Sequence, residues 1–467
     1  MVSRARESRH RCGGRRLASA LTASVAAVIG IGTLAGAVPA PHATEAGGSW
    51  TTYGGSVTRA SFQTNAPRLL PIRSRWRSSI LDGAVYGEPL IAAGLVYVAT
   101  ERDTVYALNA STGKIVWRRS LGTPTPATAL PCGDIEPTVG VTSTMVIDPA
   151  TDRLFASAST FAHGAVEHLL VALDPASGAI VFRRDLDQHG WSAAAQLQRT
   201  GLGLSAGRVL VGFGGNEGDC GAYNGYLMGI PTSGQGATLV FKVPTQREGA
   251  IWAPSGVAVN TAGDTYLATG NGSSNTTRDR GDSVIELDPS LREIGYFTPT
   301  DWLQDNANDL DLGSSSPVLL PGNRVLQVGK EQTGYLLSGA HLGGVGGQLA
   351  SATICFALGG DAVRGSTVYV GCPSTALTAV SLTGNSLRVR WRAPSGVTGS
   401  PTIAGGAVWS IGSGTLYGLS FATGKVIASI PTIPVEHFAA PSAGEGLLVV
   451  GGASQVQAFE GPAGYRP

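Results

Sequence analysis

One acidic residue lies in a stretch whose neighbours could protect it. Residues 296–302 read YFTPTDW, so Asp301 follows a threonine, a proline and a second threonine, and it precedes Trp302. Asp301 is either a turn residue beside a large aromatic side chain or a carboxylate held in a protected pocket. In a pocket it could accept a proton as a general base. The elements that position it must decide between these two interpretations.

Few of the other acidic, histidine, serine and cysteine residues occur in a known catalytic or metal-binding motif. The pair Asp309 and Asp311, with Asp305 nearby, could bind a surface calcium ion, although an acidic turn is the favoured interpretation. The histidines are scattered, and we expect His163 and His168 to share a surface loop. No HExxH, Walker or GxSxG motif occurs, and no CxxCH motif for covalent haem.

A repeated hairpin pattern runs through the chain. Each copy has an apolar strand, a turn of Asn, Asp, Ser, Thr or Gly, and a second apolar strand, which is typical of a β-hairpin. The copies include VYALNASTGKIVW (105–117), LVALDPASGAIVF (170–182), VIELDPSLREIGYF (284–297) and LYGLSFATGKVIA (416–428), with a weaker one at 377–391. Another pair of short strands precedes most copies, so each unit is predicted to be a four-stranded antiparallel sheet.

The number of units predicts an all-β fold, an eight-bladed β-propeller of four-stranded antiparallel blades. Seven blades remain an alternative, because the third and fifth units are irregular. The last unit lacks an outer strand, and PIRSRWRSSI (71–80) could supply it. That pairing would close the ring and leave no exposed sheet edge. We expect units to begin near residues 82, 139, 198, 250, 312, 358, 395 and 436.

The segment ALNASTGKIVW (107–117) resembles the repeat of the pyrroloquinoline quinone (PQQ)-like propeller family. The N-terminal WTTYGGSVTRASF (50–62) is similar to the opening segment of quinoprotein alcohol dehydrogenases. The repeat implies the fold more specifically than the activity, because it occurs in quinone-dependent dehydrogenases and in cofactor-free scaffolds. A closer similarity is to secreted propellers grouped with polyvinyl-alcohol dehydrogenases.

The resemblance implies a site by position. Glu217 in GGNEGDCGAYNGYL and Asn271 in YLATGNG would be calcium ligands, and Trp252 in GAIWAPSG would be the floor on which PQQ stacks. Lys330 in VLQVGKEQTGYLL would contact the cofactor, and Asp301 would be the catalytic base. Each residue also has an ordinary interpretation, such as an exposed loop acid, a core tryptophan, an Asn-Gly turn or a solvated lysine. Their order along the chain matches the family.

The chain departs from the family in one respect. Quinoprotein alcohol dehydrogenases carry two adjacent cysteines whose disulfide covers the cofactor, whereas PCGDIEP (131–137) offers only Cys132. Two functions therefore remain open. One is a dehydrogenase that uses PQQ and calcium to oxidise an alcohol or polyol and passes electrons to a separate acceptor. The other is a non-catalytic scaffold that binds a protein or a cell-wall partner.

The N-terminus has the layout of a secretory signal peptide. Six arginines lie in residues 4–16, and an apolar run and small residues follow. An uncleaved membrane anchor is the alternative. The predicted organisation is a signal peptide (1–43), an N-terminal extension (44–70), the propeller (71–462) and a short tail (463–467) of a secreted or envelope-associated protein.

Charge and cysteine content limit which partners and which cellular compartment are compatible with the chain. Cleavage after Ala43 would leave 27 basic and 31 acidic residues, which argues against nucleic acid as a partner. The four cysteines beyond residue 43 could form two disulfides in an exported protein, with three possible connectivities. The favoured pairs are Cys132–Cys220 and Cys355–Cys372.

Overall fold

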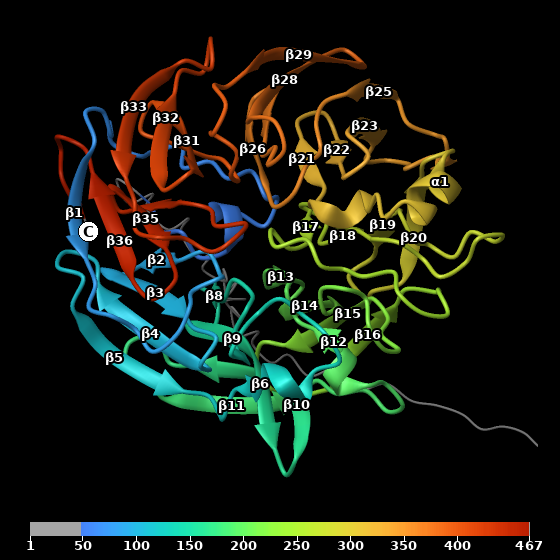
Figure 1. Cartoon of the computed structure of the whole chain (residues 1–467), viewed down its shortest axis with the longest axis horizontal. Coiled ribbons are helices and arrows are strands. Elements are labelled where there is room, and N and C mark those ends of the chain that lie inside the picture. The colour runs from blue at the N-terminus through green and yellow to red at the C-terminus, as the bar shows by residue number, and fades with distance from the viewer. Residues whose placement is uncertain (1–47, 467) are drawn as a thin grey trace, which may run out of the picture. The chain divides into compact units, whose positions relative to one another are not determined.

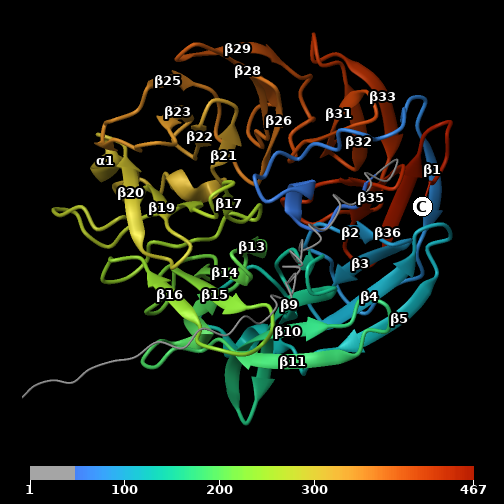
Figure 2. The same cartoon turned by 180° about the vertical axis from the view of Figure 1, so that it is seen from behind.

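Eight antiparallel sheets surround a common centre in the computed structural model, which describes residues 48–466 (Figure 1). The predicted eight-bladed propeller is therefore confirmed. Seven of the sheets follow one another around the ring in sequence order, with the first strand of each near the centre and the last near the rim (Figures 1 and 2). The predicted signal peptide at 1–43 lies outside the described residues.

The first four blades each begin a few residues after the predicted unit starts. Blade one contains β2 (Leu90–Ala92), β3 (Leu95–Ala99), β4 (Thr104–Asn109) and β5 (Ile115–Ser120). Blade two contains β8 (Val146–Asp148), β9 (Arg153–Ala162), β10 (Ala165–Leu173) and β11 (Ile180–Asp185). Blade three contains β13 (Gly203–Ser205), β14 (Arg208–Gly215), β15 (Tyr226–Pro231) and β16 (Leu239–Lys242), with β12 (Gln196–Leu197) pairing with β14. Blade four contains β17 (Ala258–Val259), β18 (Thr265–Ala268), β19 (Val284–Leu287) and β20 (Glu293–Thr298), with β24 (Gly344–Val345) parallel to β20.

The remaining blades follow the same plan. Blade five contains β21 (Val318–Leu320), β22 (Arg324–Val328), β23 (Thr333–Ser338) and β25 (Ala350–Thr353). Blade six contains β26 (Asp361–Arg364), β27 (Thr367–Val370), β28 (Thr378–Thr383) and β29 (Ser386–Arg392). Blade seven contains β30 (Thr402–Ala404), β31 (Ala407–Gly412), β32 (Thr415–Leu419) and β33 (Val426–Pro431).

Blade eight joins the two ends of the described chain. Its inner strands are β34 (Ser442–Gly444), β35 (Leu447–Gly451) and β36 (Val456–Glu460), and its outer strand is β1 (Arg73–Arg77). In Figure 1 the blue β1 lies beside the red β36. Arg73 and Arg75 both form ion pairs with Glu460, so charge pairing supports the closure that the sequence predicts.

The short elements outside the blades occupy the connections. They are β6 (Thr125–Pro126), β7 (Thr138–Val139), the helix α1 (Trp302–Ala307) and the 3-10 turns η1 (Tyr53–Gly55), η2 (Ala127–Ala129), η3 (Ala193–Ala195) and η4 (Leu312–Ser314). Within residues 48–466, no helix has the length and apolar character needed to cross a bilayer.

The turn of the repeat is explained by contacts between neighbouring blades. Gly178 lies in the turn between β10 and β11 at a φ of +68°, and a Cβ there would lie 2.5 Å from the Trp117 indole of blade one. The Trp117 indole N–H donates to the carbonyl of Pro175 in the same turn at 3.0 Å. Trp76 meets the turn at Gly113 in the same way. The glycine and the aromatic residue of the repeat therefore fit together across adjacent blades.

The core is divided into clusters that lie between facing sheets. Phe155 of blade two packs in one such cluster with Val211 and Phe213 of blade three, and all three side chains are fully buried. Burial of each such side chain contributes about 1.5–3 kcal/mol. One sheet alone could not bury these side chains, which explains why the fold needs a closed ring.

The predicted N-terminal extension contributes to the centre of the ring. Backbone hydrogen bonds join residues 50–62 to the inner strands of five blades, including Ile91 of blade one and Ile403 of blade seven. The buried Arg59 guanidinium donates to the carbonyls of Val257 and Leu202. This segment therefore connects distant blades near the axis.

One prediction about the outer surface is wrong. His168 does not lie in a surface loop but within β10, where its side chain is 1% exposed. Its Nδ1 lies 3.0 Å from the Asp187 carboxylate, and its ring packs edge-on against Phe213. The alternation of apolar residues around His168 continues the strand, and the sequence interpretation missed that pattern.

Candidate active site

A cavity of about 320 Å³ brings together four of the five predicted site residues. Glu217, Trp252, Asn271 and Lys330 line it, and Asp301 does not. Its volume falls at the lower end of the range of small-molecule sites, about 300–1,000 Å³.

The propeller topology explains why these residues meet. Glu217, Asn271 and Lys330 occupy the same connection, between the second and third strands, in blades three, four and five. Trp252 lies in the connection from the outer strand of blade three to the inner strand of blade four. In an antiparallel blade these two kinds of connection emerge on the same face of the ring. Residues far apart in the chain therefore converge at one end of the blades.

Lys330 is held by two carboxylates. Its Nζ lies 2.6 Å from Asp311 Oδ2 and 3.0 Å from Asp309 Oδ1. Burial lowers the pKa of Lys330, but the ion pairs with Asp311 and Asp309 outweigh burial and raise it above the usual value. The ammonium also lies 5.8 Å from the centre of the Trp252 ring. The cavity therefore keeps a fixed positive charge beside an aromatic face.

Asn271 is positioned by the same two acids and keeps one oxygen free. Its backbone N–H donates to Asp311 Oδ1 at 2.9 Å, and its Nδ2 donates to Asp309 Oδ1 at 3.1 Å. Its Oδ1 is buried and accepts no hydrogen bond from residues 48–466. Glu217 lines the same cavity and is exposed. An amide oxygen and a carboxylate are both ligand types that Ca²⁺ takes, so the chemistry of these two side chains suits such an ion.

A buried arginine adds a second positive charge to the cavity wall. Arg199 is 5% exposed, and its guanidinium lies over Phe438 at 5.4 Å and Tyr86 at 5.6 Å. Its Nη2 has no hydrogen-bond partner among residues 48–466. Burial lowers the pKa of Arg199, although an arginine stays charged at neutral pH. An unpaired guanidinium nitrogen in a cavity wall is suited to an anionic group such as a carboxylate.

Phe438 lies beside Trp252 in the cavity. Its ring centre lies 6.2 Å from that of Trp252, and the two rings are tilted by 54°. A planar ligand between two aromatic rings needs a separation of about 7 Å, twice the usual contact distance. A flat molecule inserted between Trp252 and Phe438 therefore requires the two rings to move apart.

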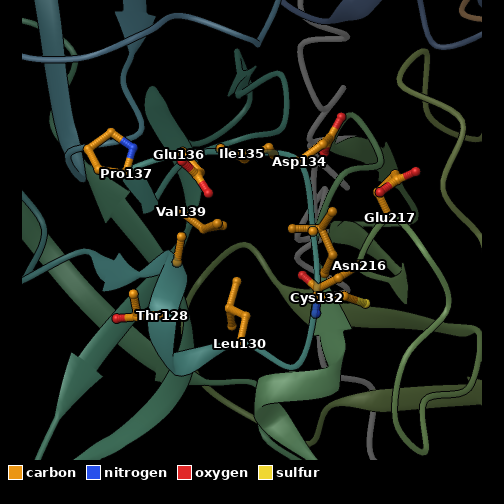
Figure 3. Close-up of a pocket in the computed structure, with 13 residues that line it drawn as sticks. Thr128, Leu130, Cys132, Asp134, Ile135, Glu136, Pro137, Val139, Asn216 and Glu217 are labelled. Atoms are coloured by element: carbon orange, nitrogen blue, oxygen red, sulfur yellow. The ribbon is translucent and has the colours of Figure 1, made fainter.

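A second cavity of about 310 Å³ adjoins the first and shares its Glu217 wall. Figure 3 shows Cys132 and Asn216 on the side of this cavity nearest Glu217, with Pro137 and Thr128 across the space. A disulfide joins Cys132 to Cys220, so the 131–137 loop is covalently tied to the loop that carries Glu217. This bridge therefore lies beside the cavity, and its two cysteines are 88 residues apart in the sequence.

The other disulfide lies elsewhere. Cys355 and Cys372 are bonded and buried in the core between blades five and six. Both bridges follow the connectivity that the sequence favours.

Asp301 lies in a different environment from the other four predicted residues. It is exposed immediately before α1, and its carboxylate faces Asp305 and Glu331. Two acids of this loop reach the cavity instead: Asp311, whose side chain is 11% exposed and is paired with Lys330, and Asp309, whose side chain is 67% exposed. From the sequence, Asp309 and Asp311 are predicted to form an acidic turn, with a surface calcium site as the alternative, and Arg199 and Phe438 are not predicted at all. An Asp-x-Asp pair such as Asp309 and Asp311, or a single arginine before a strand such as Arg199, occurs too often in proteins to indicate a site.

Comparisons with known proteins agree with this architecture. A family model described as outer membrane protein assembly factor BamB matches residues 73–153. A polyvinylalcohol dehydrogenase from Pseudomonas sp is 24% identical over 285 residues, a match that covers 53% of this chain and 40% of that protein. The matched region thus spans about two fifths of the length of that relative.

Two solved structures share the fold at low identity. The quinohemoprotein alcohol dehydrogenase from Comamonas testosteroni superposes with a TM-score of 0.66 at 16% identity, covering 90% of this chain and 81% of that one. BamB from Moraxella catarrhalis superposes with a TM-score of 0.57 at 12% identity, covering 85% and 99%. The chain resembles the PQQ-like repeat propellers in sequence and in fold. At 16% and 12% identity, these structural matches show a shared fold and nothing about activity.

Proposed function

We propose that the chain is a quinone-dependent dehydrogenase that oxidises an alcohol or polyol in the cavity of blades three to five. The observation that carries the proposal is the convergence of Glu217, Trp252, Asn271 and Lys330 on one cavity. A sequence resemblance can match single residues by chance. Four residues spread over 114 positions need not line the same cavity because of such matches, so their convergence is evidence of its own.

The residues divide the work of holding a PQQ molecule and a metal ion. Glu217 and the free Oδ1 of Asn271 would ligate calcium, and Trp252 would stack against the quinone ring system. Arg199 would pair with a cofactor carboxylate through its unpaired Nη2. Lys330 would place its positive charge near the quinone oxygens. PQQ, when bound, supplies the hydride acceptor, and the protein orients it.

Asp309 replaces Asp301 as the proposed general base. Its Oδ1 is held by Lys330 and Asn271, so the side chain is fixed at the cavity. No hydrogen bond from residues 48–466 reaches its Oδ2. That oxygen is free to accept the hydroxyl proton of an alcohol. Electrons would leave to a separate acceptor.

A non-catalytic scaffold is the second candidate, favoured by the BamB family match at 73–153 and by the tilted contact between Phe438 and Trp252, which leaves too little room for a planar ligand between the two rings. In that case the chain would bind a protein or cell-envelope partner through a face of the ring. Both candidates place the protein outside the cytoplasm, where the two disulfides would be stable. A predicted signal peptide at 1–43 agrees with this compartment.

Reconstituted turnover separates the two candidates. We expect the purified protein, incubated with PQQ and Ca²⁺, to reduce an artificial electron acceptor when polyvinyl alcohol or a short secondary alcohol is added. Omission of either PQQ or Ca²⁺ should remove the signal, because the two occupy one site. An acceptor reduction rate that does not depend on PQQ for any alcohol in the panel would favour the scaffold.

A further inference from the structure

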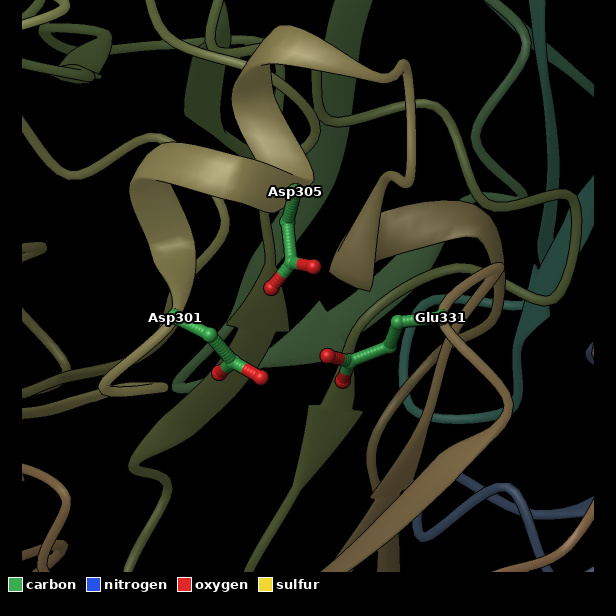
Figure 4. A group of neighbouring side chains, drawn as sticks. All are labelled: Asp301, Asp305 and Glu331. Atoms are coloured by element: carbon green, nitrogen blue, oxygen red, sulfur yellow. The ribbon is translucent and has the colours of Figure 1, made fainter.

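Three acidic side chains outside the cavity converge on one point. Asp301 immediately precedes α1, Asp305 lies within α1, and Glu331 precedes β23. One oxygen from each carboxylate lies within 4.8 Å of the others. Figure 4 shows the three carboxylates pointing toward a shared space beside α1.

Two buried oxygens in this cluster lack a hydrogen-bond donor. Asp305 is only 4% exposed, and its Oδ2 has no hydrogen-bond donor among residues 48–466. Glu331 Oε1 is also buried without a donor, while its Oε2 accepts a hydrogen bond from the Tyr335 hydroxyl at 3.0 Å. A buried polar atom left unpaired costs about 1–3 kcal/mol, and more when it is charged.

No basic side chain neutralises the cluster. Within residues 48–466, no Lys, Arg or His forms an ion pair with any of the three acids, and Lys330 is committed to Asp309 and Asp311. A cation placed among the three carboxylates would neutralise them and would supply the partner that the unpaired buried oxygens of Asp305 and Glu331 lack.

We propose that Asp301, Asp305 and Glu331 form a calcium-binding site distinct from the cavity. Calcium binds oxygen ligands at about 2.3–2.6 Å, so two oxygens on one ion lie at most about 5 Å apart. The observed spacing meets that limit without movement of the backbone. Asp301 is also free to act as a ligand, because its side chain makes no capping hydrogen bond to α1.

The proposed ion would tie together the two segments that build one wall of the cavity. Asp309 follows Asp305 by four residues, and Lys330 immediately precedes Glu331. A cation that bridges Asp305 and Glu331 therefore fixes the relative position of the segments that carry Asp309 and Lys330. This site does not depend on whether PQQ binds, since neither Glu217 nor Asn271 takes part in it.

The test uses chelator-treated full-length protein without PQQ. We expect Tb³⁺, a luminescent substitute for Ca²⁺, to show emission sensitised by Tyr335 and Trp302, which Ca²⁺ displaces. Asp301→Asn, an exposed position that spares the fold, and Glu331→Gln should each weaken Ca²⁺ binding at least tenfold. Glu217→Gln, which alters only the cavity, should retain the part of the sensitised emission that Asp301→Asn removes.

Calorimetric titration with Ca²⁺ provides the second readout. Wild-type protein should show a binding event that Glu217→Gln retains and Asp301→Asn loses, together with a Ca²⁺-dependent rise in Tm. The proposal is overturned if Asp301→Asn and Glu331→Gln bind Ca²⁺ as tightly as wild type. It is overturned equally if no sensitised Tb³⁺ emission appears in folded wild-type protein.

Discussion

Asp309→Asn is expected to lower quinone-dependent alcohol turnover by about 10²–10⁴-fold, the usual contribution of a general base. The amide that replaces the carboxylate cannot accept the hydroxyl proton, although it retains the size of the side chain. Stability should change little, because the side chain is 67% exposed and surface ion pairs contribute about 0–1 kcal/mol. The measurement is kcat of the reconstituted enzyme with an artificial acceptor, together with Tm.

Asp288→Asn is the matched control for this prediction. It makes the same chemical change in the turn between β19 and β20, where Asp288 pairs with Arg292, and it does not line the cavity. Its kcat should equal that of wild type. Turnover that survives Asp309→Asn but is lost in Asp301→Asn would return the role of the base to Asp301.

Removal of the Cys132–Cys220 bridge is expected to weaken PQQ binding on the order of tenfold, about 1.4 kcal/mol. The bridge ties the 131–137 loop to the loop that carries Glu217, and both loops line the cavities. The double variant Cys132→Ser, Cys220→Ser should also lose about 2–4 kcal/mol of unfolding free energy, since the bridge closes a loop of 88 residues. Equilibrium binding and chemical denaturation measure the two effects separately.

The second disulfide supplies a matched control. Cys355→Ser, Cys372→Ser removes a bridge across 17 residues in the core of blades five and six. It should lower stability while it leaves PQQ affinity unchanged, because neither cysteine lines the cavity. Equal losses of PQQ affinity in the two double variants would show that the effect is general destabilisation.

Much of the fold follows from local patterns in the sequence. Alternating apolar residues on either side of Asx- and Gly-rich turns predict the blades, because sheet faces and hairpin turns have fixed periods. The pairing of β1 with β36 follows from a missing strand in the last unit and a spare one before the first. His168 was misplaced because a polar residue inside an apolar strand was taken as a loop residue.

The site is only partly readable from the sequence. Glu217, Asn271 and Lys330 occupy equivalent connections, so the repeat itself places them on one face. The loop between β20 and β21 has no such constraint, because it inserts α1 between two acids eight residues apart. Which acid reaches the cavity depends on how α1 packs, and Asp309 rather than Asp301 does so.

The most direct test of the proposed cofactor site is a titration of the full-length protein with PQQ in the presence of Ca²⁺, followed by tryptophan fluorescence. The account predicts saturable quenching with one PQQ per chain, lost in Trp252→Ala and retained in Trp117→Ala, whose indole lies between blades one and two. Quenching of equal affinity in both variants, or no saturable quenching of folded wild-type protein, would contradict it.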